Sequence, residues 1–314
     1  MARIHRKAQG ESNGKAARCA RRPSSRHCAF ASNRAVRSNP PVPSQIQLPV
    51  AITIAGSDTG GGAGVQADLK TFAAFGVHGV CAITCLTAQN PRRVLAIEPC
   101  SPAMLRAQLK AVSEDFPIRA AKTGMLGNRR LVAEVVRWCR KVPRVAVVVD
   151  PVLVSTSGRR LLDRDGEKLL RDQLLPIATL VTPNLAEAVR LSGRRIRALD
   201  DVREAARIIH ARFGCAVLVK GGHLTRESDA TDFFLWDKFA WDISRPRWRG
   251  VKTHGTGCTF SAAIAAGLAS GQSLPAAVNR AKDFISEAIA HSPRAGRHAL
   301  LQWNREGIRV KFAE

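Results

Sequence analysis

Short apolar runs alternate with longer stretches of helical periodicity between Leu48 and Ala290. The runs suit buried strands, and the periodic stretches suit helices that cover them, which is the pattern of α/β folds. The pattern predicts strands over residues 49–55, 79–86, 145–149, 179–182 and 216–220. It predicts helices over residues 65–75, 102–115, 129–141, 185–191, 202–213, 258–270 and 274–290. No internal repeat or linker divides this region, so we expect one α/β domain.

The first 47 residues differ from the rest in composition. They hold ten Lys or Arg and one acidic residue, and they show no hydrophobic periodicity, which predicts a disordered basic leader. We therefore expect a leader over residues 1–47, a folded domain over 48–300 and a tail over 301–314. An organellar transit peptide and a start assigned upstream of the true domain are both open for the leader, whereas a secretory signal lacks its apolar segment.

The formal net charge of +24, from 49 Lys and Arg against 25 Asp and Glu, raises the question of a nucleic-acid ligand. The basic residues after the leader are scattered, and the chain has no Tyr and only 5% aromatic residues, so it offers no stacking platform for bases. Attraction of an anionic substrate explains the positive charge at least as well as binding to a nucleic acid does. No apolar run reaches ~18 residues, which argues against a membrane span. The eight cysteines form no CxxC pair, so we expect reduced thiols and a cytoplasmic location.

A glycine-rich turn over residues 254–259 opens directly into an apolar helical segment. The first amides of a helix lack intrahelical acceptors and lie at the positive end of the helix dipole, so such a turn predicts an anion site. Cys258 would lie among these amides, where the pKa of a thiol can be lowered. The thiol is then a candidate proton acceptor or hydrogen-bond partner for a reacting hydroxyl. An ordinary helix start is the alternative.

Other candidates follow predicted strands, where ligands of open α/β sheets bind. Asp150, Asn184 and Lys220 lie at such ends, and the Gln89 amide could read the edge of a heterocycle. Asn184 and Glu187 have the spacing to serve a hydrated Mg²⁺ beside phosphates, or else they simply start a helix. The glycines at 56–64 lack the P-loop spacing. Asp68 is, from the sequence alone, more simply a solvated acid.

The segments 55–58, 61–71, 88–90, 122–126, 150–152, 182–187, 220–223 and 254–259 occur in order and with sensible spacing. Together they closely resemble the hydroxymethylpyrimidine/phosphomethylpyrimidine kinases of thiamine biosynthesis, which have the ribokinase-like fold. The resemblance implies a three-layer α/β/α sandwich with a central, mostly parallel sheet, and a homodimer. It implies ATP-dependent phosphorylation of 4-amino-5-hydroxymethyl-2-methylpyrimidine to its monophosphate and then its diphosphate. ATP and Mg²⁺ are the implied cofactors, with a monovalent cation as a further candidate.

The resemblance also implies roles for individual residues. The positions that match the pyrimidine surround are Gly56, Asp68, Gln89, Met125 and Val152. Those that match the anion hole near the accepting oxygen are Gly255, Gly257 and Cys258. Those that match the nucleotide and phosphate region are Asp150, Asn184, Glu187, Lys220 and Thr256, with Asp150 and Glu187 as the metal ligands. Whether Cys258 is a base or only an anion-hole element stays open.

The main alternative is a pyridoxal or pyridoxine kinase, against which Gln89 and Met125 favour the aminopyrimidine. Leu153 and the segment 91–93 depart from the family pattern, which leaves ring selectivity less defined than kinase class. A basic nucleic-acid-binding protein is the alternative from another class. A non-catalytic pyrimidine sensor is a third, and the retained Asp150, Glu187 and Cys258 argue against it.

Overall fold

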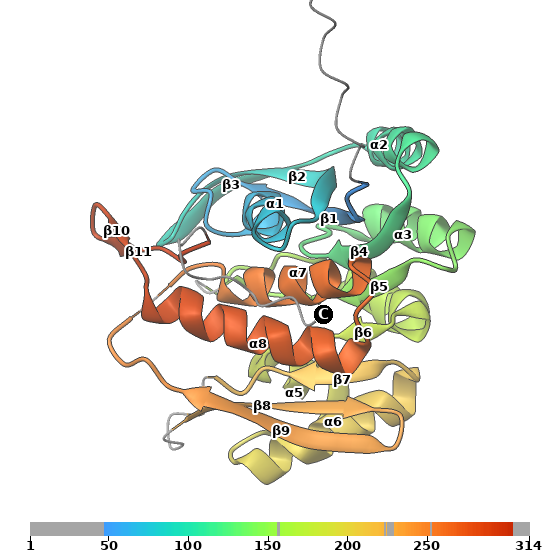
Figure 1. Cartoon of the computed structure of the whole chain (residues 1–314). Helices are drawn as coiled ribbons and strands as arrows, with labels where there is room; N and C mark the ends of the chain where they lie inside the picture. Colours follow the sequence, from blue (N-terminus) through green and yellow to red (C-terminus); the bar gives the residue numbers. More distant parts are fainter. Residues whose placement is uncertain (1–46, 156–157, 223, 225–228, 252, 304–314) are drawn as a thin grey trace, which may run out of the picture. The chain divides into compact units, whose positions relative to one another are not determined.

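The computed structural model describes residues 47–155, 158–222, 224, 229–251 and 253–303 (Figure 1). Almost all of the expected leader and most of the expected tail lie outside the described residues. The rest of the chain carries the predicted α/β elements, so the site can be followed strand by strand.

Within the described residues, nine strands form one sheet in the order β3-β2-β1-β4-β5-β6-β7-β8-β9. The strands are β1 Val50–Asp58, β2 His78–Asn90, β3 Arg93–Pro99, β4 Ile118–Thr123, β5 Ala146–Val149, β6 Leu180–Val181, β7 Ala216–Val219, β8 Asp229–Trp236 and β9 Phe239–Pro246. The six neighbouring strands β2, β1, β4, β5, β6 and β7 are parallel to one another. At the two edges of the sheet, β3 on one side and β8 and β9 on the other are antiparallel to their neighbours. The mostly parallel sheet confirms the expected fold class.

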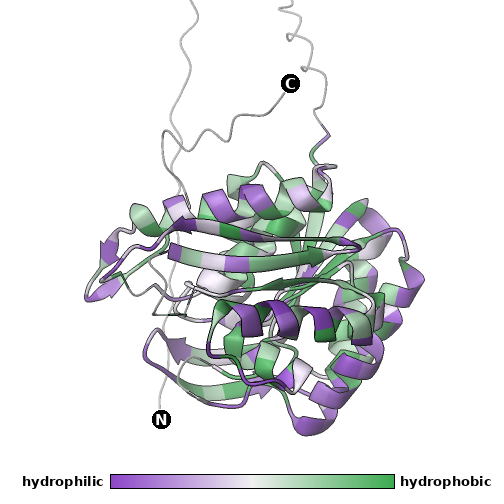
Figure 2. Cartoon of the chain, turned by 90° about the horizontal axis from the view of Figure 1, so that it is seen from below, coloured by the Kyte–Doolittle hydropathy of each residue, from purple (hydrophilic) through white to green (hydrophobic). Residues whose placement is uncertain are grey.

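Helices cover both faces of the sheet because successive strand residues point to opposite sides. Val147 and Val149 of β5 belong to one apolar core, whereas Val148 between them belongs to the other. The first core packs under α2 Pro102–Asp115, α3 Arg129–Lys141, α4 Arg164–Leu169, α5 Leu185–Ser192 and α6 Leu199–Phe213. The second packs under α1 Gly64–Ala74, α7 Thr256–Ala269 and α8 Leu274–Ala290. Figure 2 shows apolar residues along the central strands and polar residues on the outer sides of the helices.

Every predicted helix and strand is present, and α2, α3 and α8 have the predicted bounds. Ser101, Asn128 and Ser273 precede these three helices, and each accepts a hydrogen bond from a first-turn amide. The sequence did not predict β3, β4, α4, β8 and β9, nor the short segments η1 Leu170–Leu174, η2 Leu175–Ile177, β10 Arg294–Ala295 and β11 His298–Ala299. None of the helices in the described part of the chain is long and apolar enough to cross a membrane.

Candidate functional site

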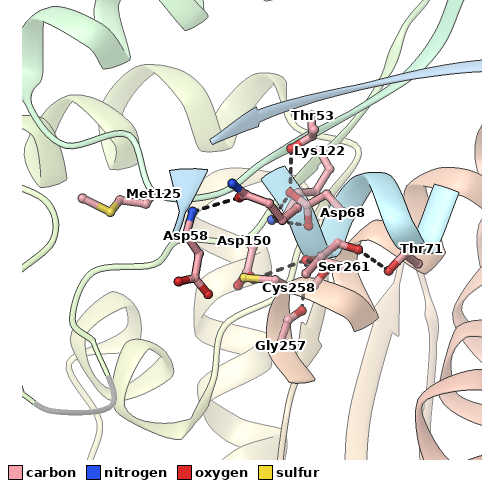
Figure 3. Close-up of polar contacts among 12 residues, drawn as sticks. Thr53, Asp58, Asp68, Thr71, Lys122, Met125, Asp150, Gly257, Cys258 and Ser261 are labelled. Carbon is pink, nitrogen blue, oxygen red and sulfur yellow. Dashed lines mark hydrogen bonds and ion pairs between the residues drawn. The ribbon is translucent and has the colours of Figure 1, made fainter. Parts of the chain in front are cut away.

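The carboxyl ends of the parallel strands bring together residues that are far apart in the sequence (Figure 3). Asp58 ends β1, Lys122 lies near the end of β4, and Asp150 follows β5. Asn184 is the N-cap of α5, and Lys220 follows β7. The structure therefore places Asp150, Asn184 and Lys220 at the sheet edge, where the sequence predicted them.

Asp150 and Lys220 form an ion pair beneath the start of α7. Nζ of Lys220 lies 2.9 Å from Oδ1 of Asp150, and the Ser261 hydroxyl donates to Oδ2 at 3.2 Å. A Cβ atom on Gly257 would lie 3.1 Å from Nζ of Lys220, so the glycine turn passes directly over the pair. Burial disfavours the ammonium, but attraction by Asp150 and Glu187 outweighs it and raises the pKa of Lys220. A fixed cation thus lies under the predicted anion loop.

Asn184 and Glu187 start α5 with a reciprocal capping box. The Glu187 carboxylate accepts from the amides of Asn184 at 2.9 Å and Leu153 at 3.3 Å, which ties α5 to the turn after β5. The helix-start interpretation is thus confirmed for the local structure. Val152, in the tied turn, has a φ of 39°, a left-handed conformation that is rare for a β-branched residue. Strain of this kind concentrates at functional sites.

The charges around Asp150 bear on the expected Mg²⁺. Asp150 and Glu187 are both buried and repel one another, while Lys220 balances one of the two charges. Burial raises the pKa of Glu187. In the described part of the chain, no group of three or more His, Cys, Asp or Glu side chains could hold a metal ion. Mg²⁺ bound with phosphates commonly needs only one or two protein carboxylates, so the pair fits that ion as a partial ligand set.

Asp68 is fully buried, so the interpretation as a solvated acid is wrong. Both of its oxygens contact Nζ of Lys122, at 3.0 and 2.9 Å, and the Thr53 hydroxyl donates to Oδ2 at 2.6 Å. Lys122 is also fully buried; burial lowers the pKa of its ammonium, but attraction by Asp68 outweighs this and raises it. The two side chains therefore form a charged pair inside the protein, and the role of Asp68 toward a pyrimidine stays a prediction.

Cys258 lies in the first turn of α7, half-buried. Burial raises the pKa of its thiol above the ordinary 9.0, although the Lys122 ammonium acts in the opposite direction. The expected lowering at a helix N-terminus is therefore wrong for the free protein, because desolvation of the thiolate exceeds the favourable charges. The thiol would be a proton acceptor only if the bound reactants altered this balance. A role as a hydrogen-bonding element needs no such change.

The two glycine-rich loops, far apart in the sequence, lie against one another through His254. Its Nε2 is 3.1 Å from Oδ2 of Asp58 and 3.1 Å from Nε2 of Gln89. Asp58 also accepts from the amides of Gly60 and Ala63. Burial raises the pKa of Asp58, but these hydrogen bonds and that of His254 outweigh burial, so the pKa lies below its ordinary value. The loops are thereby joined beside the Gln89 amide; Gln89 is the next-to-last residue of strand β2 and does not follow it.

Gly255 is the point of closest approach between the loops. It has a φ of 83°, and a Cβ atom there would lie 1.7 Å from the Gly62 carbonyl oxygen. We predict that Gly255→Ala separates the loops and lowers kcat/KM at least about tenfold, because positioning errors near 1 Å can cost about a hundredfold. The check is steady-state kinetics beside thermal unfolding. Gly271→Ala is the control, since Gly271 also has a positive φ but has no atom near its Cβ position.

A small apolar floor lies next to the loops. A Cβ atom on Gly56 would lie 3.4 Å from Sδ of Met125 and 3.7 Å from Cβ of Cys85. The Thr84 hydroxyl donates to the Met125 carbonyl at 2.6 Å and fixes that segment. Gly56 and Met125, both predicted near a pyrimidine, are thus neighbours. In the segment 91–93, which departs from the family pattern, residues 91 and 92 form the turn between β2 and β3, and Arg93 begins β3.

From the sequence alone, no role was assigned to Asp58, His254 or Ser261, and Lys122 was included only as part of the matching segment 122–126. Only His254 carried a signal, because it directly precedes Gly255. The others depend on partners that are distant in the sequence. Thr256, expected near the nucleotide, is the first residue of α7, and its hydroxyl lies 2.8 Å from that of Thr253.

Comparison with known proteins gives an independent view of the chain. The sequence model of the phosphomethylpyrimidine kinase family matches residues 58–302. The hydroxymethylpyrimidine/phosphomethylpyrimidine kinase of Rhizobium meliloti is 48% identical over 248 residues, which cover 78% of this chain and 92% of that protein.

Solved structures of kinases are also similar to this chain. The phosphomethylpyrimidine kinase of Clostridium difficile is similar with a TM-score of 0.69 and 39% identity, covering 77% of this chain and all of that one. Pyridoxal kinase from Bacillus subtilis, in a complex with ADP, is similar with a TM-score of 0.75 and 36% identity, covering 82% and 97% of the two chains.

Proposed function

The chain belongs to the phosphomethylpyrimidine kinase family, and from this we propose that it phosphorylates 4-amino-5-hydroxymethyl-2-methylpyrimidine with ATP, first to the monophosphate and then to the diphosphate. The protein is a phosphotransferase of thiamine biosynthesis. The observation that carries the proposal is the glycine turn at the start of α7, which passes over the Lys220–Asp150 pair. Cys258 lies in the first turn of this helix. That arrangement suits a phosphoryl group between a nucleotide and an accepting hydroxyl.

The chemistry is in-line transfer, for which positioning and charge neutralisation supply most of the rate. The amides at the start of α7 would hold the transferred phosphoryl group, and Lys220 would compensate its charge from below. Cys258 would contact the accepting hydroxymethyl oxygen. Asp150 and Glu187 would hold Mg²⁺, which when bound neutralises the phosphates of the nucleotide.

One site serves both phosphorylations in this proposal. The second acceptor carries a phosphate already, so the site must tolerate additional negative charge. Lys122 supports this, since it is a buried cation whose charge also acts on Cys258 and Asp150. The ring would rest on the floor formed by Gly56 and Met125, with Gln89 at its polar edge and Val152 in the adjoining turn.

A pyridoxal kinase is the second candidate, because a pyridoxal kinase is among the similar structures. The family match and the hydroxymethylpyrimidine/phosphomethylpyrimidine kinase relative favour the pyrimidine. We also propose a homodimer in the cytoplasm, with small-molecule ligands and no nucleic acid; these remain predictions.

The test is ADP release by the purified full chain with Mg-ATP and one acceptor at a time, with products resolved by mass. We expect turnover of the hydroxymethylpyrimidine and of its monophosphate, and much slower turnover of pyridoxal. Asp150→Ala, purified in parallel, controls for contaminating kinases. Pyridoxal as the only substrate would move the function to vitamin B6 salvage, and no turnover of any acceptor would favour a sensor.

A further inference from the structure

A third buried ion pair lies behind Lys220, outside the site described so far. Nζ of Lys282, on α8, is 2.7 Å from Oδ2 of Asp232, on β8, and both side chains are almost fully buried. Nζ of Lys282 also donates to the Ala230 carbonyl at 2.7 Å. The remaining oxygen of Asp232, Oδ1, accepts from the backbone amide of Gly221 at 2.9 Å. Through this hydrogen bond, the ion pair contacts Gly221, the residue next to Lys220.

The backbone at Lys220 and Gly221 is held from two sides. The Lys220 amide donates to the Pro183 carbonyl at 2.8 Å, on the side of α5. Gly221 packs so closely on β8 that a Cβ atom there would lie 2.1 Å from the Thr231 carbonyl oxygen. With Asp232 fixing the next amide, the Lys220 side chain starts from a defined point and reaches Asp150 beneath Gly257.

Stability alone is a poor reason for this pair. Desolvation of two charges offsets much of their attraction, so well-packed apolar replacements of buried ion pairs are often neutral or stabilising. An apolar pair could not, however, accept the hydrogen bond of the Gly221 amide. We propose that Asp232 is a positioning residue for Lys220, and through Lys220 for the phosphates of ATP, with Lys282 balancing its charge. The inference rests on the proposed kinase function.

Two charge-balanced double variants isolate the Gly221 hydrogen bond. Asp232→Leu with Lys282→Met removes both charges and leaves the Gly221 amide without its acceptor. Asp232→Asn with Lys282→Met also removes both charges but keeps an acceptor oxygen for that amide. We expect the leucine variant to weaken ATP binding and raise KM for ATP by about tenfold, which is the size of effect of one lost buried hydrogen bond. The asparagine variant should stay within about threefold of the wild type, and KM for the pyrimidine should change little in either.

The measurements are KM for both substrates, direct binding of a non-hydrolysable ATP analogue, and thermal unfolding. Glu134→Leu is the matched control, because Glu134, on α3, is a buried carboxylate paired with Arg106 on α2 and with Arg137 on α3. It should lower stability without changing KM for ATP. Equal ATP affinity in the two double variants would overturn the positioning role. Absence of ADP release by the wild type would instead refute the kinase function.

Discussion

Replacing Cys258 by alanine is expected to lower kcat by about a hundredfold or more for both phosphorylations, the usual contribution of a positioned proton acceptor or anion-hole donor. The thiol lies in the first turn of α7, on the loop that passes over Lys220 and Asp150, and the charge of Lys122 acts on it. The measurement is single-turnover kinetics with each pyrimidine, so that product release does not hide the chemical step. Full kcat with both acceptors would remove Cys258 from the mechanism.

Two further variants separate the possible roles of the thiol. Cys258→Asp keeps a proton acceptor, whereas Cys258→Ser keeps hydrogen bonding with little basicity. If the aspartate variant is the more active, proton transfer is favoured; if the serine variant is, a hydrogen-bonding role is favoured.

Alkylation of Cys258 by iodoacetamide should report its ionisation. Because burial raises the pKa of the thiol above 9.0, alkylation of the free enzyme should be slow at pH 7 and accelerate only above about pH 9.

The elements that the sequence predicted well carry local signals. A capping serine or asparagine precedes α2, α3 and α8, so a local feature of the sequence marks the start of each helix. The missed β4 has the sequence Ile-Arg-Ala-Ala-Lys-Thr, in which charged and small residues hide a strand whose last four residues are buried. Lys122, in this strand, is a charged residue that no hydrophobic pattern marks as buried. It is nevertheless fully buried, because Asp68 neutralises its charge. The missed β8 and β9 turn at Asp237 and Lys238, which lack the usual glycine signal.

The same distinction holds for the site. Residues in the glycine turn and at strand ends were predictable because their chemistry is local to a motif. The burial of Asp68 was not, since its partners Thr53 and Lys122 come from two strands, 15 and 54 residues away. The pKa direction of Cys258 was also beyond the motif, because a helix N-terminus and burial act in opposite directions and only the packing decides between them. A single sequence does not show which residues on different strands of the sheet will contact one another.

Replacing Lys122 by methionine is expected to lower the free energy of unfolding by about 3–5 kcal/mol at neutral pH and to abolish most activity, because it leaves the fully buried Asp68 carboxylate unpaired. Adding Asp68→Asn removes the unpaired charge and keeps an acceptor for the Thr53 hydroxyl. The double variant should recover most of the stability. Activity should stay low, because the cation whose field reaches Cys258 and Asp150 is still absent.

The pH dependence of Lys122→Met distinguishes an unpaired charge from a packing defect. Burial raises the pKa of Asp68, and the Lys122 ammonium is the main influence in the opposite direction. Without Lys122, the folded-state pKa of Asp68 rises further above its unfolded value of 3.8, so folding takes up a proton wherever the pH lies between these two values. The destabilisation should therefore be largest near pH 8 and shrink as the pH falls toward about 4. Urea unfolding at several pH values measures it, and a loss of stability that does not vary with pH would indicate a cavity instead of an unpaired carboxylate.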